Sequence, residues 1–267
     1  MLAAIFAAEL IAAVVVPAPP VRDKPAAPAH TLVVADRTVR LISLGGPPSD
    51  RLLSRVAGDI GTAVDAVVAF WGADWPHDIS VVAAGSREQF LAAVGGGPAS
   101  QWADIAAVTV ADSVDPQRRV ALGERIVFAP DADTMSAAAL RIVLSHELFH
   151  YAARAVTAMD APRWLTEGVA DFVARPATSL PTAAVTAPRS LPLDDDLDAP
   201  GRQRSLAYDR AWLFARFVAD SYGPARLREF YLATCGVGHA DIPAATRDVL
   251  GTDEAGLLAR WQQWLAG

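Results

Sequence analysis

In the first half of the chain, hydrophobic and polar positions alternate in short runs typical of β-strands. Residues 30–44, HTLVVADRTVRLISL, alternate and are rich in β-branched side chains, so they predict one strand or a hairpin. Helical spacing of apolar residues predicts a helix over 50–71, with Asp50 as its cap. Further apolar runs predict a short helix over 87–95 and strands over 78–86, 105–112 and 125–130. This half therefore reads as an α+β lobe with a small sheet.

The second half has the periodicity of helices almost throughout. Residues 136–157 and 162–174 predict two helices, and Pro162 suits the first turn of the second one. Residues 175–206 contain several prolines and the run LDDDLD, which indicates a loop. Helical spacing then resumes over 207–222, 224–233, 241–250 and 253–265. We therefore predict an α+β lobe over 30–135, followed by a mostly α-helical lobe over 136–267.

The N-terminal segment differs from both lobes. Its first sixteen residues, MLAAIFAAELIAAVVV, are apolar except for Glu9, and the run is shorter than the roughly 20 residues of a membrane-spanning helix. It resembles the apolar part of a secretory signal, and a Pro/Ala-rich linker follows over 17–29. We expect an exported protein, either secreted or tethered by residues 1–16 on the extracytoplasmic side of the membrane. The alternative is a buried N-terminal helix.

Composition narrows the possible functions. The net charge is −7 and no basic stripe is visible, so nucleic acid is not an expected partner. The single cysteine excludes a disulfide within the chain and a cysteine-rich zinc site. The run over 193–198 could bind calcium, but it lacks the Gly and Glu of an EF-hand loop, which favours a solvated loop. We expect a monomer.

The stretch HELFH in the predicted helix over 136–157 has the spacing of a metal site. His146 and His150 are four residues apart, so both imidazoles lie on one face of a helix, and Glu147 is turned by about 100° from the first. The surrounding residues make this helix apolar nearly all round. This argues against the alternative that the histidines and the glutamate simply face solvent on the surface of the helix. Buried histidines and a glutamate need partners, and a metal ion supplies one.

A catalytic zinc usually takes three protein ligands, so a third one is needed. The metzincin pattern would require Gly and His where this chain has Ala153 and Val156. Glu167, in WLTEGVADF, is the only glutamate between residues 148 and 228, and it lies on the next predicted helix. Asp171 follows on the same face and could accept a hydrogen bond from the far nitrogen of a ligating histidine.

The pair HELFH and WLTEGVADF resembles the gluzincin metallopeptidases, in particular the peptidase-MA-like group. The W-L-x-E-G segment is similar to the third-ligand helix of the aminopeptidase-N family, and E-x-x-x-D is similar to thermolysin-type enzymes. The resemblance covers roughly residues 123–233. It implies a zincin-like fold and one zinc ion per chain, held by His146, His150 and Glu167. It also implies that Glu147 activates water, with Asp171 behind the ligands.

The same resemblance implies a group that stabilises the oxyanion. Tyr208, in AYDRAW, occupies the place of the Tyr in the Y-x-K-G pattern of the aminopeptidase-N family, although Arg210 and Ala211 replace the Lys and Gly. The alternative is a core or interface tyrosine. The G-x-M-E-N motif is absent, so aminopeptidase activity is not implied. By analogy, the strand over 125–130 would line the cleft and pair with a peptide; the alternative is an ordinary edge strand.

These features lead to one main hypothesis about function. We expect a zinc-dependent metallopeptidase that hydrolyses peptide or protein substrates with a zinc-activated water and Glu147 as general base. The alternative from another class is a non-catalytic extracellular binding module on a gluzincin scaffold. A cytoplasmic structural protein is a third possibility, which the apolar N-terminus disfavours.

Overall fold

The computed structural model describes residues 29–98, 102, 105–177 and 188–267. The chain divides into two compact units, one ending at Ala155 and one spanning Val156–Gly267. The sequence suggested a boundary before residue 136. The division falls later because the helix over Ala137–Ala153 packs on the sheet of the first unit.

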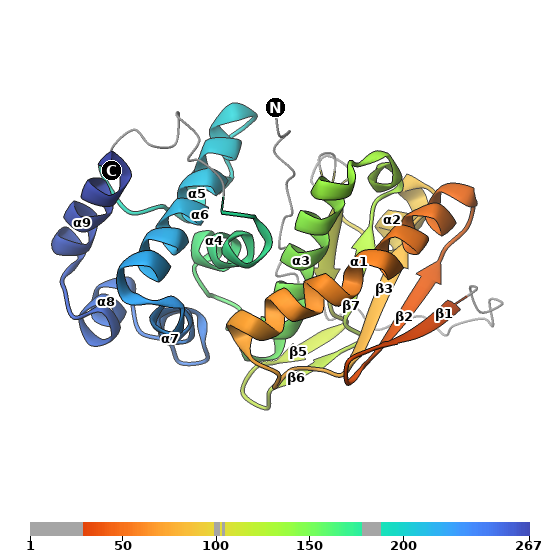
Figure 1. The fold of residues 1–267 in the computed structure, drawn as a ribbon, viewed down its shortest axis with the longest axis horizontal. Coiled ribbons are helices and arrows are strands. Elements are labelled where there is room, and N and C mark those ends of the chain that lie inside the picture. Colours follow the sequence, from red (N-terminus) through yellow and green to blue (C-terminus); the bar gives the residue numbers. More distant parts are fainter. Residues whose placement is uncertain (1–28, 99–101, 103–104, 178–187) are drawn as a thin grey trace. The chain divides into compact units, whose positions relative to one another are not determined.

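A five-stranded mixed sheet forms the centre of the first unit. Its order is β1 (Ala29–Val34), β2 (Arg37–Ser43), β3 (Asp78–Ala83), β7 (Arg125–Phe128) and β4 (Ala107–Val110). The strands β1 and β2 form the predicted antiparallel hairpin, β2, β3 and β7 run parallel, and β4 pairs antiparallel with β7. Together with the helices, this sheet confirms the α+β class expected from the alternating pattern (Figure 1).

The position of β7 corrects one expectation. Residues 125–130 were expected to form an edge strand that could pair with a peptide, but β7 lies between β3 and β4. Ile126, Val127 and Phe128 are fully buried, as expected of an interior strand covered on both faces. The edge strands of this sheet are β1 and β4.

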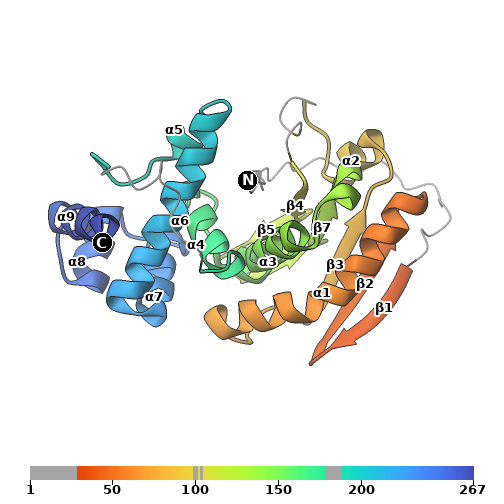
Figure 2. The ribbon, with the colours of Figure 1, turned by 45° about the horizontal axis from the view of Figure 1, so that its top comes forward.

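Helices cover both faces of the sheet. The helices α1 (Pro47–Trp71) and α3 (Ala137–Ala153) pack side by side over one face (Figures 1 and 2). The short helix α2 (Arg87–Ala93) contributes Phe90 to an apolar cluster on the other face, which includes Trp102, Val108 and Val127. Successive strand residues point to opposite faces, so the neighbours of Val108 and Val127 face α1 and α3.

Two local details of the first unit differ from the sequence prediction. The helix α1 begins at Pro47, after Gly46, so Asp50 lies in its first turn and does not cap it. Proline suits the first helical positions because its φ is already helical and its missing N–H has no partner there. In addition, β5 (Ser113–Asp115) and β6 (Val120–Leu122) form a small separate hairpin that the sequence did not predict.

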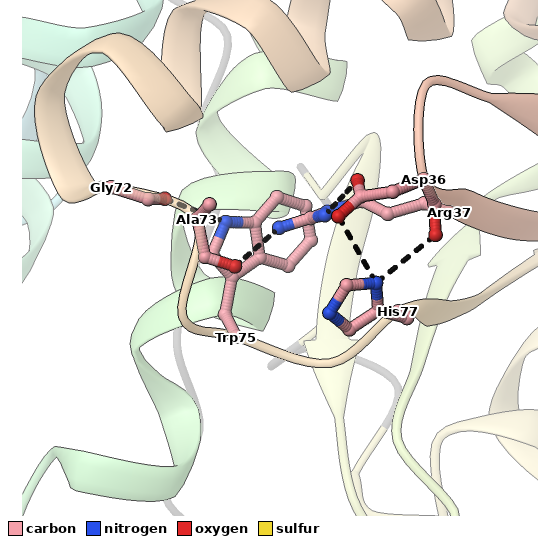
Figure 3. Close-up of polar contacts among 6 residues, drawn as sticks. All are labelled: Asp36, Arg37, Gly72, Ala73, Trp75 and His77. Atoms are coloured by element: carbon pink, nitrogen blue, oxygen red, sulfur yellow. Dashed lines mark hydrogen bonds and ion pairs between the residues drawn. The ribbon is translucent and has the colours of Figure 1, made fainter.

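A buried arginine ties the β1–β2 hairpin to the loop that follows α1 (Figure 3). The Arg37 side chain is fully buried, donates to Asp36 at 2.6 Å and to the Ala73 carbonyl at 2.9 Å, and stacks 3.7 Å from the centroid of Trp75. His77 lies 3.0 Å from the Asp36 carbonyl. These contacts compensate the buried charge and hold the loop that leads into β3.

The second unit consists of helices. They are α4 (Arg163–Ala174), α5 (Asp194–Leu197), α6 (Arg202–Tyr222), α7 (Pro224–Cys235), α8 (Ile242–Leu250) and α9 (Glu254–Ala266). The central helix α6 packs against α4, α7 and α9. Phe214 makes edge-to-face contacts with Trp164 at 5.1 Å and with Trp261 at 5.4 Å, so one aromatic cluster joins α4, α6 and α9.

Within the described part of the chain, no helix combines the length and the apolar character needed to cross a membrane. The predicted export signal or membrane anchor falls almost entirely on residues 1–28, which lie outside the described residues.

Candidate metal centre

The helix α3, which carries HELFH, is buried on all sides over its second half. Its N-terminus is capped by Ser136, whose hydroxyl accepts from the Ala139 N–H at 3.2 Å. Every residue from 143 to 153 is buried, which confirms the apolar surroundings inferred from the sequence. Tyr151 donates to the Asp78 carbonyl at 2.8 Å and so attaches this helix to β3. A helix in this position can carry polar side chains only if each one finds a partner.

The two histidines present the same ring nitrogen to each other. The Nε2 atoms of His146 and His150 are 3.0 Å apart, and the ring planes cross at 69°. Two nitrogen ligands of a tetrahedral zinc ion, each about 2.0–2.1 Å from the metal, lie about 3.3 Å apart. The spacing of the two nitrogens in this structure is therefore close to that of a ligand pair.

Glu167 completes a group of three donors. His146, His150 and Glu167 are all buried, and each offers a ligand atom within 4.8 Å of the others. Two imidazole nitrogens and one carboxylate oxygen can hold a divalent metal ion. The structure thus brings together the three residues that the sequence pattern selected as ligands.

An acidic residue far along the sequence fixes the start of α4, which carries Glu167. Pro162 precedes this helix and has no side chain that could cap it. The Asp194 carboxylate instead accepts from the Trp164 N–H at 2.7 Å, and Asp198 pairs with Arg163 at 2.5 Å. The acidic run over 193–198 thus contains the short helix α5, whose first residue caps α4, so the expectation of a loop was wrong, whereas Asp195, Asp196 and Asp198 are exposed as expected.

Asp171 lies one turn after Glu167 and has a cationic partner in the same unit. Its Oδ2 atom is 2.5 Å from Arg175, which also pairs with Asp209 at 2.7 Å. Burial alone would lower the pKa of Arg175, but the two carboxylates outweigh this effect and raise the pKa above its usual value. The predicted role of Asp171 behind the histidines stays a prediction.

Tyr208 is buried on α6, a helix that packs against α4. Burial, followed by the negative charge of Glu167, raises the pKa of its phenol well above the usual value, although Arg163 and Arg204 partly oppose this. The phenol is therefore neutral near pH 7 and can donate a hydrogen bond. The predicted role of Tyr208 in stabilising the oxyanion stays a prediction.

Glu147 has a partner that the sequence did not reveal. The hydroxyl of Thr109 on β4 lies 2.8 Å from the Glu147 Oε2 atom and 2.8 Å from the Glu147 backbone carbonyl, and both residues are buried. Thr109 is one polar position in the apolar run AAVTV. Threonine is common in strands, so this position carries no recognisable signal in the sequence.

The comparisons with known proteins add no family to these observations. No protein-family model matches the chain, and no curated protein matches it. The functional interpretation therefore rests on the residues of the site and on the sequence patterns that predicted them.

Proposed function

We propose that the protein is a zinc-dependent metallopeptidase with a zincin-like fold. The observation that carries this proposal is the buried group of His146, His150 and Glu167, with Glu147 immediately after the first ligand. Three protein ligands leave the fourth position of a tetrahedral zinc ion for water or substrate, which is the arrangement of a catalytic zinc site. The HELFH spacing on a buried helix supports the same reading.

The residues around this group suit peptide hydrolysis. A bound zinc ion would lower the pKa of a water molecule and polarise the scissile carbonyl. Glu147 would accept the proton of the attacking water and deliver it to the leaving amine. The neutral phenol of Tyr208 would donate a hydrogen bond to the oxygen on which negative charge develops.

The edge of β4 that faces away from β7 is the place that we propose for the peptide substrate. Ala129 donates to the Ala106 carbonyl at 2.8 Å, so in this antiparallel pair Thr109 and its neighbour Ile126 form a non-hydrogen-bonded pair. The backbone N–H and carbonyl of Thr109 therefore point away from β7. An extended peptide could pair with these groups, close to the Glu147 carboxylate.

The remaining parts of the proposal rest on the sequence. The apolar segment over residues 1–16 supports export, with the enzyme secreted or tethered on the extracytoplasmic side. The proposed partner is a peptide or protein substrate.

Metal removal is the first test. We expect the purified chain to contain about one zinc ion per molecule, since the described residues include one group of three donors. A chelator should abolish cleavage of a peptide library, and added zinc should restore it. Metal analysis by mass spectrometry and the cleavage assay together check this. Stoichiometric zinc without any cleavage would favour the non-catalytic binding module, and a chain without metal would contradict the proposed centre.

Tyr208→Phe tests the oxyanion donor. We expect kcat to fall about a hundredfold, with KM and zinc content unchanged, because the loss is confined to a hydrogen bond made in the transition state. Tyr222→Phe is a matched control at the end of the same helix, where the hydroxyl accepts from Arg260 at 3.0 Å. An unchanged kcat in Tyr208→Phe would remove this residue from the mechanism and leave it as a core tyrosine.

A further inference from the structure

The Thr109 side chain, in the apolar strand β4, forms a hydrogen bond with the proposed general base, Glu147. It faces the side of the sheet covered by α3, since Val108, its neighbour in sequence, belongs to the apolar cluster on the opposite side. The hydroxyl is buried and contacts two oxygen atoms of the same residue, Glu147. One of these is the backbone carbonyl, whose place is fixed by α3. The other is the carboxylate oxygen Oε2, whose place depends on three side-chain torsions.

The chemistry of the two contacts differs. A carbonyl oxygen only accepts hydrogen bonds, whereas a hydroxyl has one proton to donate and lone pairs that accept. When the Glu147 carboxylate is ionised, the Thr109 proton can point at Oε2 and form a charge-assisted hydrogen bond. The contact at 2.8 Å therefore joins a carboxylate that could otherwise rotate to a hydroxyl that is held on the sheet.

We propose that Thr109 is a positioning residue that holds the Glu147 carboxylate in one orientation. This inference rests on the proposed role of Glu147 as general base. A hydroxyl on the sheet suits this task because β4 is held by its pairing with β7, so the partner of Oε2 does not move with the helix side chain. If the role of Thr109 were only structural, its hydroxyl would donate to the Glu147 backbone carbonyl alone. The Glu147 carboxylate would then have no hydrogen bond that fixes its orientation.

Thr109→Val and Thr109→Ser test the proposal as a pair. Valine keeps the shape and removes the hydroxyl, and we expect kcat to fall about ten- to a hundredfold because the base is misplaced, with KM and zinc content unchanged. Serine keeps the hydroxyl and should restore kcat to within about threefold of the unchanged chain. Thr38→Val, in strand β2, is the control for a threonine-to-valine change in the same sheet. A Thr109→Val variant with unchanged kcat would overturn the proposal.

Two further readouts separate this inference from the proposed function. In a Glu147→Gln background, Thr109→Val should cause no additional loss of the residual rate, because its effect passes through Glu147. Crystal structures of the variants should show the Glu147 carboxylate displaced in Thr109→Val and in place in Thr109→Ser. An undisplaced carboxylate in the valine variant would refute the positioning role. If the unchanged chain cleaves no peptide, the proposed function fails, and the crystal structures still decide whether Thr109 positions Glu147.

Discussion

The Glu147→Gln variant is expected to retain zinc and to lose peptidase activity, with kcat lowered roughly a thousandfold. Glutamine has nearly the shape of glutamate, so the buried site next to His146 can accept it, and its amide can still meet the Thr109 hydroxyl. The amide cannot take a proton from water at neutral pH, so the proposed general base is absent. The zinc ligands are His146, His150 and Glu167 in our proposal, and none of them is changed.

Zinc content and kcat measured on the same preparation check this expectation. Glu88→Gln, an exposed change in the first turn of α2, is the matched control and should leave both quantities unchanged. Turnover retained in Glu147→Gln would remove Glu147 from the mechanism. Loss of zinc from this variant would instead indicate that the carboxylate helps to hold the metal.

The Gly168→Ala variant is expected to have the largest effect on stability. A Cβ atom at this position would lie 2.5 Å from the Ala211 carbonyl oxygen, which belongs to the backbone of α6 and cannot rotate away. The helices α4 and α6 would have to separate, so we expect the free energy of unfolding to fall by about 2 kcal/mol or more. This loss exceeds the gain of about 1 kcal/mol that alanine brings to a helix interior. Because Glu167 precedes this glycine, zinc affinity should fall as well.

Gly58→Ala provides the opposite case in an exposed position of α1. A Cβ atom there would meet no atom within 4 Å, so we expect a gain of about 0.5–1 kcal/mol from helix propensity alone. Denaturant unfolding with matched zinc titrations compares the two variants. If Gly168→Ala and Gly58→Ala are equally stable, the close approach of α4 and α6 does not contribute to stability. If Gly168→Ala is destabilised but binds zinc with unchanged affinity, that close approach does not affect the metal centre.

The spacing of the two proposed ligands on α3 was predictable because a helix has fixed local geometry. Residues four apart lie on one face of any α-helix, so His146 and His150 could be paired from sequence alone. The third donor, Glu167, was predictable by elimination, since no other glutamate follows before residue 229. Most strands and helices were predictable for a similar reason. Hydrophobic residues recur with a period of about 2 in a strand and about 3.6 in a helix, so the pattern indicates the type of element.

Other parts of the fold and the site depend on contacts between distant segments. The interior place of β7 follows from its parallel pairing with β3, which no local pattern encodes. The capping of α4 by Asp194 joins residues thirty positions apart. The local sequence of the acidic run over 193–198 therefore predicted only a loop. The contact of Thr109 with Glu147 spans thirty-eight positions and involves a residue type that is ordinary in strands.

The sequence by itself determined the chemistry available to this protein: two histidines one helical turn apart, a glutamate beside them, and one further glutamate as third donor. Helical periodicity and residue type are local properties, so they can be read without the fold. Tertiary structure alone decided which neighbours these side chains have. It buried the second half of α3 on all sides, capped α4 with a distant aspartate, and set the Thr109 hydroxyl against the Glu147 carboxylate. The physical reason is that such contacts depend on strand order and helix packing, which arise only when distant segments of the chain meet.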